Sequence, residues 1–143
     1  MKGVIFSIAA GVFICLQAVF NTRLAEKLGF CGTNVFVHGT GLIVALIILL
    51  FAGDCRWSGI TQTNPVYLLG GLLGVAIIYS IMMGVSSLGA TLAIAIVLVV
   101  QLSTAAVIDG FGLFGNPQKS FHLLKLVGLA VMVAGIIIFQ IKE

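Results

Sequence analysis

The stretch that decides the fold runs from Trp57 to Ile108 and reads WSGITQTNPVYLLGGLLGVAIIYSIMMGVSSLGATLAIAIVLVVQLSTAAVI. It contains no Asp, Glu, Lys or Arg. A helix crosses the hydrocarbon core of a bilayer with about 20 residues, so this stretch is too long for one crossing and long enough for two. Glycines and serines within Gly84–Gly89 interrupt it near its middle. We therefore predict one membrane span on each side of that interruption.

Uncharged runs elsewhere in the chain predict three more spans in the same way. Turns are expected at 21–29, 53–65 and 110–122, where charged, Gly, Asn or Pro residues gather. Lys2 precedes the first apolar run as in a signal peptide, but no small-x-small cleavage site closes that run, and we interpret it as a retained helix. The prediction is an all-α polytopic membrane protein with one domain, 1–143, and five transmembrane helices, at about 3–22, 30–52, 66–85, 90–108 and 123–141.

The composition supports a membrane protein and excludes several other classes. The chain of 143 residues is 61% hydrophobic and 8% charged, with a mean hydropathy of +1.28, whereas soluble domains carry roughly 25% charged residues. The pI of about 9.0 is therefore no sign of nucleic-acid binding. Three cysteines, Cys15, Cys31 and Cys55, have no CxxC spacing and are expected to act as small apolar side chains. We predict no metal site, no cofactor and no enzymatic activity.

The basic residues show almost no preference for one side of the membrane. An excess of Lys and Arg in cytoplasmic loops normally sets the orientation of a membrane protein. With the spans above, four basic residues fall on one side and three on the other, so the chain is expected to insert both ways up. The two groups are Lys2, Arg56, Lys119 and Lys125 on the first side, and Arg23, Lys27 and Lys142 on the second.

An odd number of spans places the termini on opposite sides of the membrane. Two inverted copies would give ten helices related by an axis in the membrane plane, which is the inverted-repeat plan of many secondary transporters. One five-helix unit uses the whole chain, so the second half must come from another chain, most simply an identical one. The expected partners are thus an inverted copy in an antiparallel homodimer and the lipid bilayer.

Small residues at helical spacing are candidates for close helix packing. Lipid gives no hydrophobic drive for helices to associate, so close backbone contact matters. The candidates are Gly3, Ser7 and Gly11 in the first span and Gly70, Gly71 and Gly74 at the start of the third.

Polar residues at membrane depth are costly and are candidates for function. Asn34 and His38 share one face of the second span, and Ser80 follows Tyr79 in the third. The candidates for the lining of a substrate cavity are Gln17, Asn21, His38, Tyr79 and Gln101. The alternatives remain open: the glutamines can bond one helix to another, and His38 can be a satisfied interior residue.

Coupling to protons has little support in the pattern. No Asp or Glu falls inside a predicted span, whereas a proton-coupled antiporter usually relies on a buried carboxylate. His38 and Asp109 are the two candidates for coupling or gating. Asp109 ends the fourth span at the negative end of the helix dipole, which favours a Lys or Arg partner; its alternative role is an interfacial cap.

The order of several short motifs resembles a known family. They are Gln17-x-x-x-Asn21-x-x-Leu24, Gly70-Gly71-x-x-Gly74, Leu88-Gly89, and Gln101 followed by Asp109-Gly110-Phe111-Gly112. Over essentially the whole chain this is similar to the YdcZ family, a half-size branch of the drug/metabolite transporter superfamily in bacterial inner membranes. The chain departs from the family pattern at Val100, where a Gly is frequent, and at Gly110, where a His is frequent. The resemblance implies an architecture and a transport class, and a multi-pass protein of the inner membrane.

The predicted function is small-molecule transport by alternating access in a dual-topology antiparallel homodimer. With so few charges, the cavity is expected to suit small neutral, aromatic or weakly charged compounds. A passive channel is an alternative, although a channel needs a more continuous polar lining. A non-transporting membrane subunit that pairs with a paralogue is another. A membrane enzyme is least expected, since no nucleophile–base pair or paired carboxylates are present.

Overall fold

The described part of the structure, a computed structural model, comprises residues 1–53, 55–118 and 123–141. Within these residues the chain forms helices and turns and no strand. It divides into two compact units, Met1–Ser87 and Leu88–Glu143.

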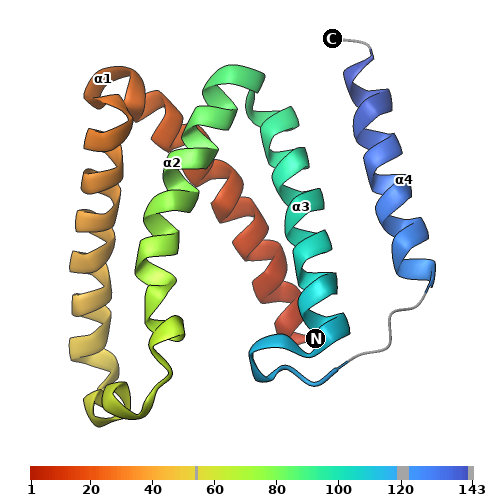
Figure 1. Cartoon of the computed structure of the whole chain (residues 1–143). Coiled ribbons are helices and arrows are strands. Elements are labelled where there is room, and N and C mark those ends of the chain that lie inside the picture. The colour runs from red at the N-terminus through yellow and green to blue at the C-terminus, as the bar shows by residue number, and fades with distance from the viewer. Residues whose placement is uncertain (54, 119–122, 142–143) are drawn as a thin grey trace. The chain divides into compact units, whose positions relative to one another are not determined.

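The first unit begins with a long helix that is broken at a single residue. Helix α1 covers Lys2–Ala52, but Gly29 has φ 72° and ψ 163°, which no helical residue adopts. Without that break, 51 residues would extend about 75 Å at 1.5 Å per residue, more than twice the hydrocarbon thickness of a bilayer. Figure 1 shows the chain reversing at this point and the second half of α1 descending beside α2.

The turn predicted at 21–29 is wrong in its extent. Residues Asn21–Leu28 continue the helix, and only Gly29 leaves it. Most of these residues are good helix formers, and Arg23 pairs with Glu26 one turn later, so local chemistry favours helix up to the glycine. The turn was predicted because this segment is charged. Charged side chains are also common on exposed helical turns, so they do not distinguish the two.

A connection with two short 3₁₀ helices links α1 to the next long helix. Gly53, with φ 62°, ends α1 in the left-handed conformation, and its N–H donates to the carbonyl of Leu49 at 3.0 Å. The 3₁₀ segments η1 and η2 follow at Trp57–Gln62 and Pro65–Leu69, and α2 covers Gly70–Leu88. The helical run predicted from residue 66 therefore starts as a 3₁₀ turn, which the Asn64 side chain caps by accepting from the Val66 N–H at 3.1 Å.

The second unit contains two packed helices. Helix α3 covers Ala90–Phe111, and α4 covers Leu123–Gln140 and packs against it. The predicted interruption within Gly84–Gly89 is confirmed as a helix break, because Gly89 has φ 79° and ψ 162°. After α3, Gly112 adopts φ 63° as a C-cap, and the short 3₁₀ turn η3 follows at Leu113–Gly115. Gln118 then folds back and donates from Nε2 to the carbonyl of Gly110 at 3.1 Å.

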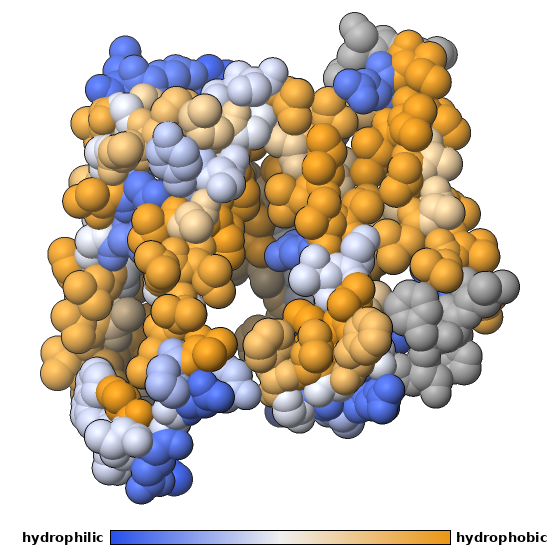
Figure 2. Space-filling view, viewed as in Figure 1, coloured by the Kyte–Doolittle hydropathy of each residue, from blue (hydrophilic) through white to orange (hydrophobic). Residues whose placement is uncertain are grey.

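The surface of these helices is apolar. Three helices, Lys2–Ala52, Pro65–Leu88 and Ala90–Phe111, are long and apolar enough to cross a membrane, and Leu124–Gln140 is a shorter apolar helix. In the most apolar stretch of α1 none of the residues is buried. On the face of the Met1–Ser87 unit drawn in Figure 2, apolar residues cover most of the helix bodies and hydrophilic residues gather toward their ends. An all-helical membrane protein is thereby confirmed; the number of membrane crossings, the single five-helix domain and the antiparallel pairing remain predictions.

Candidate functional site

A groove lies between the second half of α1 and α2, inside the first unit. Its volume is about 710 Å³, within the range of small-molecule sites. Two of the predicted cavity residues, His38 and Tyr79, line it together. The other lining residues are Cys31, Asn34, Val35, Leu72, Val75, Ala76 and Ser80.

Asn34 joins the two walls of this groove. Its Nδ2 donates to the carbonyl oxygen of Val75 on α2 at 2.8 Å. The residue is 6% exposed, and its Oδ1 has no hydrogen-bond partner among the residues that the structure describes. A buried carbonyl left unpaired costs about 1–3 kcal/mol. The side chain therefore holds the two helices together through its nitrogen, while its oxygen is buried against protein.

His38 lies one helical turn after Asn34 on the same face of α1. Its Nδ1 is 2.9 Å from the backbone carbonyl of Asn34. A carbonyl only accepts, so Nδ1 carries the hydrogen of this bond. Nε2 points to Gly74 on α2, where an added Cβ would lie 3.4 Å away. The absence of a side chain at residue 74 thus leaves space beside the imidazole.

Tyr79, which lines the groove, also makes an aromatic contact with Phe30 of α1. The rings of Phe30 and Tyr79 are 6.0 Å apart between centroids, with an angle of 65° between their planes. Such edge-to-face pairs contribute about 0.5–1.5 kcal/mol beyond the area they bury. Phe30 directly follows Gly29, so the backbone reversal at the glycine sets where this ring meets α2.

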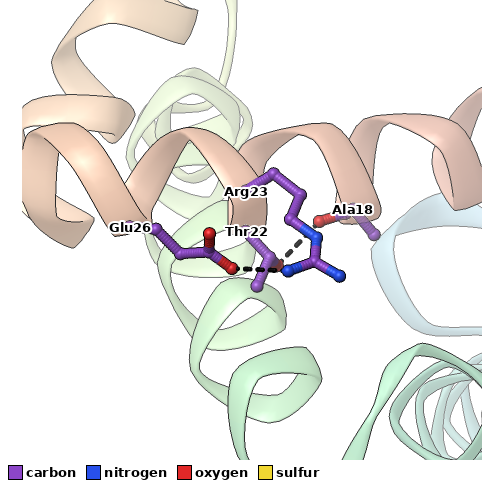
Figure 3. A network of polar contacts seen from close by, with 4 residues as sticks. All are labelled: Ala18, Thr22, Arg23 and Glu26. Carbon is purple, nitrogen blue, oxygen red and sulfur yellow. Dashed lines mark hydrogen bonds and ion pairs between the residues drawn. The ribbon is translucent and has the colours of Figure 1, made fainter.

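The charged turn before Gly29 is a surface feature. Figure 3 shows Arg23 reaching along the helix to Glu26, with Nη1 2.8 Å from Oε1, while the Thr22 hydroxyl donates to the carbonyl of Ala18 at 2.8 Å. The two charged side chains are 76% and 54% exposed, so their pairing contributes about 0–1 kcal/mol at most. This turn does not line the groove.

The remaining predicted cavity residues are not brought to this groove. Asn21 is buried, with 7% exposure, in the turn of α1 before the break, and Gln17 is exposed one turn earlier. Gln101 is exposed on α3, in the other unit. Their role as substrate ligands remains a prediction.

Sequence reasoning recognised the shared face of Asn34 and His38 but left Asn34 out of the candidate set. Its i, i+4 spacing from His38 was the available signal. The bond from Asn34 to a backbone carbonyl of α2 carries no sequence signal, because any residue at 75 supplies the same carbonyl.

In the second unit, Asp109 and Lys125 line one groove between α3 and α4. The groove has a volume of about 370 Å³, and Gly128 and Met132 are among its other lining residues. The sequence predicted a Lys or Arg partner for Asp109, and Lys125 lines the same groove. The coupling or gating role of Asp109 remains a prediction, and Lys119 and Lys142 lie outside the described residues.

Of the glycines predicted to pack helices, Gly74 faces a side chain of another helical segment, that of His38. Space is open over Gly3, Gly11, Gly70 and Gly71, and Ser7 is exposed. A packing role for these five residues stays a prediction. Among the described residues, no three His, Cys, Asp or Glu side chains group together as a metal site would require.

Comparison with known proteins identifies the class. A family model described as "Putative inner membrane exporter, YdcZ" matches residues 3–138, nearly the whole chain. The chain belongs to the YdcZ family, which indicates a membrane transporter. Searches of curated proteins and of solved structures found no match.

Proposed function

We propose that this protein transports small molecules by alternating access, as a dual-topology antiparallel homodimer of five-helix chains. The observation that carries the proposal is the groove of about 710 Å³ between apolar membrane helices, which the polar residues Asn34 and His38 line. Polar groups at membrane depth are expensive and usually mark a transport pathway. The exporter family supports the same function.

The break at Gly29 supports five crossings per chain. It divides α1 into two segments, each long enough to span the hydrocarbon core, and α2, α3 and α4 supply three more. Five crossings place the two termini on opposite sides, and the near-even split of basic residues leaves the orientation undetermined. An inverted second copy would then complete a ten-helix transporter.

In this proposal the groove is half of the substrate site, and the inverted copy covers its open side. His38 and Tyr79 contact the substrate there, while Gln17, Asn21 and Gln101 are candidates for lining the pathway in the assembled dimer. Asp109 and His38 are the candidates for coupling or gating.

The test is flux through purified protein in proteoliposomes, measured across a broad metabolite panel. Saturable flux of a neutral or weakly charged compound supports transport. Flux far above the turnover of transporters points to a channel, and purification only together with a paralogue points to a pairing subunit. No saturable flux, together with no thermal shift from any compound, refutes the proposal.

A second measurement tests the arrangement of the chain. A cytoplasm-active and a periplasm-active reporter are fused, separately, after Glu143. Comparable activity of both reporters supports dual topology, and activity of one alone contradicts it.

Replacing His38 and Asp109 together by neutral residues tests coupling. If pH-driven flux is unchanged in this double variant, both residues are excluded as proton carriers.

A further inference from the structure

Gln101 carries an exposed amide at the middle of an apolar helix. Its neighbours Ser103 and Thr104 donate their hydroxyls to the carbonyls of Val99 and Val100 in the same helix, at 2.7 and 2.8 Å. Within the described residues the Gln101 side chain makes no such bond. An amide without a partner is costly in lipid, so we look for a partner outside the helix.

The depth of Gln101 matters because an inverted pair is symmetric about the middle of the membrane. Helix α3 has 22 residues, so it is about 33 Å long and matches the hydrocarbon thickness. Its middle falls between Val100 and Gln101, which places Gln101 about 0.8 Å from mid-depth. The two-fold axis of an inverted pair lies in the membrane plane, so each residue and its copy are equally far from mid-depth on opposite sides. The two Gln101 residues are therefore about 1.5 Å apart along the membrane normal.

Gln17 is also an exposed glutamine of a predicted span, but it does not meet this condition. Its span, 3–22, is centred between Val12 and Phe13, so Gln17 lies about 7 Å from mid-depth. Its copy would lie about 14 Å away along the membrane normal, which is too far for two glutamine side chains to bond directly. Depth therefore distinguishes Gln101 from Gln17.

Gln101 also projects from the side of α3 that α4 does not cover. The α3 residues that line grooves against α4 include Ala95, Val99, Leu102 and Ala106. At 3.6 residues per turn, these four point about 100–160° away from Gln101. The amide is therefore directed away from α4, on a side where a helix of another chain can approach.

An inverted α3 is complementary to this helix in charge as well as in hydrogen bonding. An amide has both donor and acceptor atoms, so two copies of it can satisfy each other. The N-terminus of α3 has no side-chain cap and no acidic residue in its first turn, and Asp109 lies near the C-terminus. In an antiparallel pair centred on Gln101, the carboxylate of each chain lies at the depth of the other helix's first turn, where the helix dipole is positive.

Resting on the antiparallel homodimer proposed above, we propose that α3 forms part of the contact between the two inverted copies. The amide of Gln101 in each copy donates to the amide oxygen of Gln101 in the other, so two reciprocal bonds cross the axis. A lipid chain would leave both amides unpaired at this depth.

Disulfide cross-linking in cell membranes, with copper phenanthroline as the oxidant, maps this contact. Single cysteines are placed in the cysteine-free background C15A/C31A/C55A. Q101C is expected to form a disulfide-linked dimer. V99C, at a residue that faces the groove with α4, is the control and should stay monomeric. Cross-linking of Q101C that does not exceed that of V99C overturns the proposal.

A second pair of positions reports the direction of the two helices. Val97 and Thr104 point within about 60° of Gln101. In the antiparallel pair each is about 9–12 Å from its own copy along the membrane normal, whereas Val97 of one chain lies beside Thr104 of the other. V97C and T104C, co-expressed with different tags, should therefore cross-link with each other several-fold more than either does with itself. Efficient cross-linking of each cysteine to its own copy would mean a parallel pair and overturns the proposal.

The contribution of the amide is tested with Q101L in the parent protein. This variant is expected to lower the dimer fraction several-fold on dilution in detergent, measured by size-exclusion chromatography with light scattering. T104V is the matched control, because the Thr104 hydroxyl bonds to its own helix. A dimer fraction in Q101L equal to that of the parent, or an equal loss in both variants, overturns the proposal. If Q101L does not fold, the cross-linking decides.

These outcomes separate the contact from the proposed function. Dual topology in the reporter assay without cross-linking of Q101C would keep the antiparallel homodimer and refute this contact. Cross-linking in the expected pattern without flux in proteoliposomes would keep the contact and refute transport. Flux that Q101L changes while the dimer fraction stays the same would make Gln101 a substrate ligand and refute its role between the copies.

Discussion

Gly29 and Gly89 adopt the same backbone conformation, with φ and ψ of 72° and 163° at the first and 79° and 162° at the second. Each follows a leucine and separates two apolar helical segments. This region of backbone space is essentially restricted to glycine. The two breaks that divide the apolar sequence therefore depend on the one residue type that can make them.

Replacing Gly29 by alanine is expected to destabilise the protein by about 1–3 kcal/mol, because a Cβ is strained at this φ and ψ. Thermal unfolding in detergent measures the effect. G41A, at a helical glycine in the same helix, is the control and should be neutral or slightly stabilising, since alanine favours helix. Equal melting temperatures for G29A and G41A would contradict the assigned conformation.

N34L is expected to leave stability nearly unchanged even though it removes a hydrogen bond between helices. The lost bond to Val75 contributes about 0.5–1.5 kcal/mol, whereas removal of the unpaired Oδ1 relieves about 1–3 kcal/mol. Thermal unfolding should thus show a small change of either sign, while flux falls. A melting temperature lower by many degrees would mean that Oδ1 is satisfied in the folded protein.

The contact between Phe30 and Tyr79 should depend on the ring and not on the hydroxyl. Y79F keeps the edge-to-face pair and is expected to unfold at the temperature of the parent protein. Y79L keeps an apolar side chain but loses the pair, at a cost of about 0.5–1.5 kcal/mol. Similar unfolding of Y79L and Y79F would show that the ring contact contributes nothing.

Charge substitutions should fix the orientation of the chain. Arg23→Ala with Lys27→Ala leaves Lys142 as the basic residue on its predicted side, and the four on the other side should then become cytoplasmic. Lys2→Ala, Arg56→Ala and Lys125→Ala together should give the opposite bias. The reporters at Glu143 measure each orientation.

Each biased variant alone is expected to lose flux, and co-expression of the two should restore it, because the proposed dimer needs one chain of each orientation. Full activity of either variant by itself would refute the antiparallel pairing. Loss of the exposed Arg23–Glu26 pair is not expected to confuse the result, since it contributes about 0–1 kcal/mol at most.

The helical membrane class and the break near Gly89 were predictable because they depend on local chemistry. Uncharged runs of about 20 residues must be helices in lipid, where each backbone polar group needs an internal partner. The extent of the turn at 21–29 was not predictable from its charges. An exposed helical turn accepts Arg23, Glu26 and Lys27 as readily as a loop does.

In the candidate site, the sequence places His38 and Tyr79 inside predicted spans, where polar residues are unusual, and both line the groove. The role of Asn34 could not be read in the same way. Its partner is the backbone of Val75, 41 residues away, and backbone atoms are the same at every residue. Gly74 likewise appeared to be one of several packing glycines until its neighbour was known.

By itself, then, the sequence determined that this is a helical membrane protein, that its long uncharged run breaks near Gly89, and which polar residues are exceptional, because hydropathy and the backbone freedom of glycine act over a few neighbouring residues. The tertiary structure decided which of those residues share a site. It set the second half of α1 beside α2, so that Asn34 bonds to Val75 and Nε2 of His38 meets Gly74. Such contacts arise from packing between distant segments, and no local pattern specifies which atoms of two apolar helices will face each other.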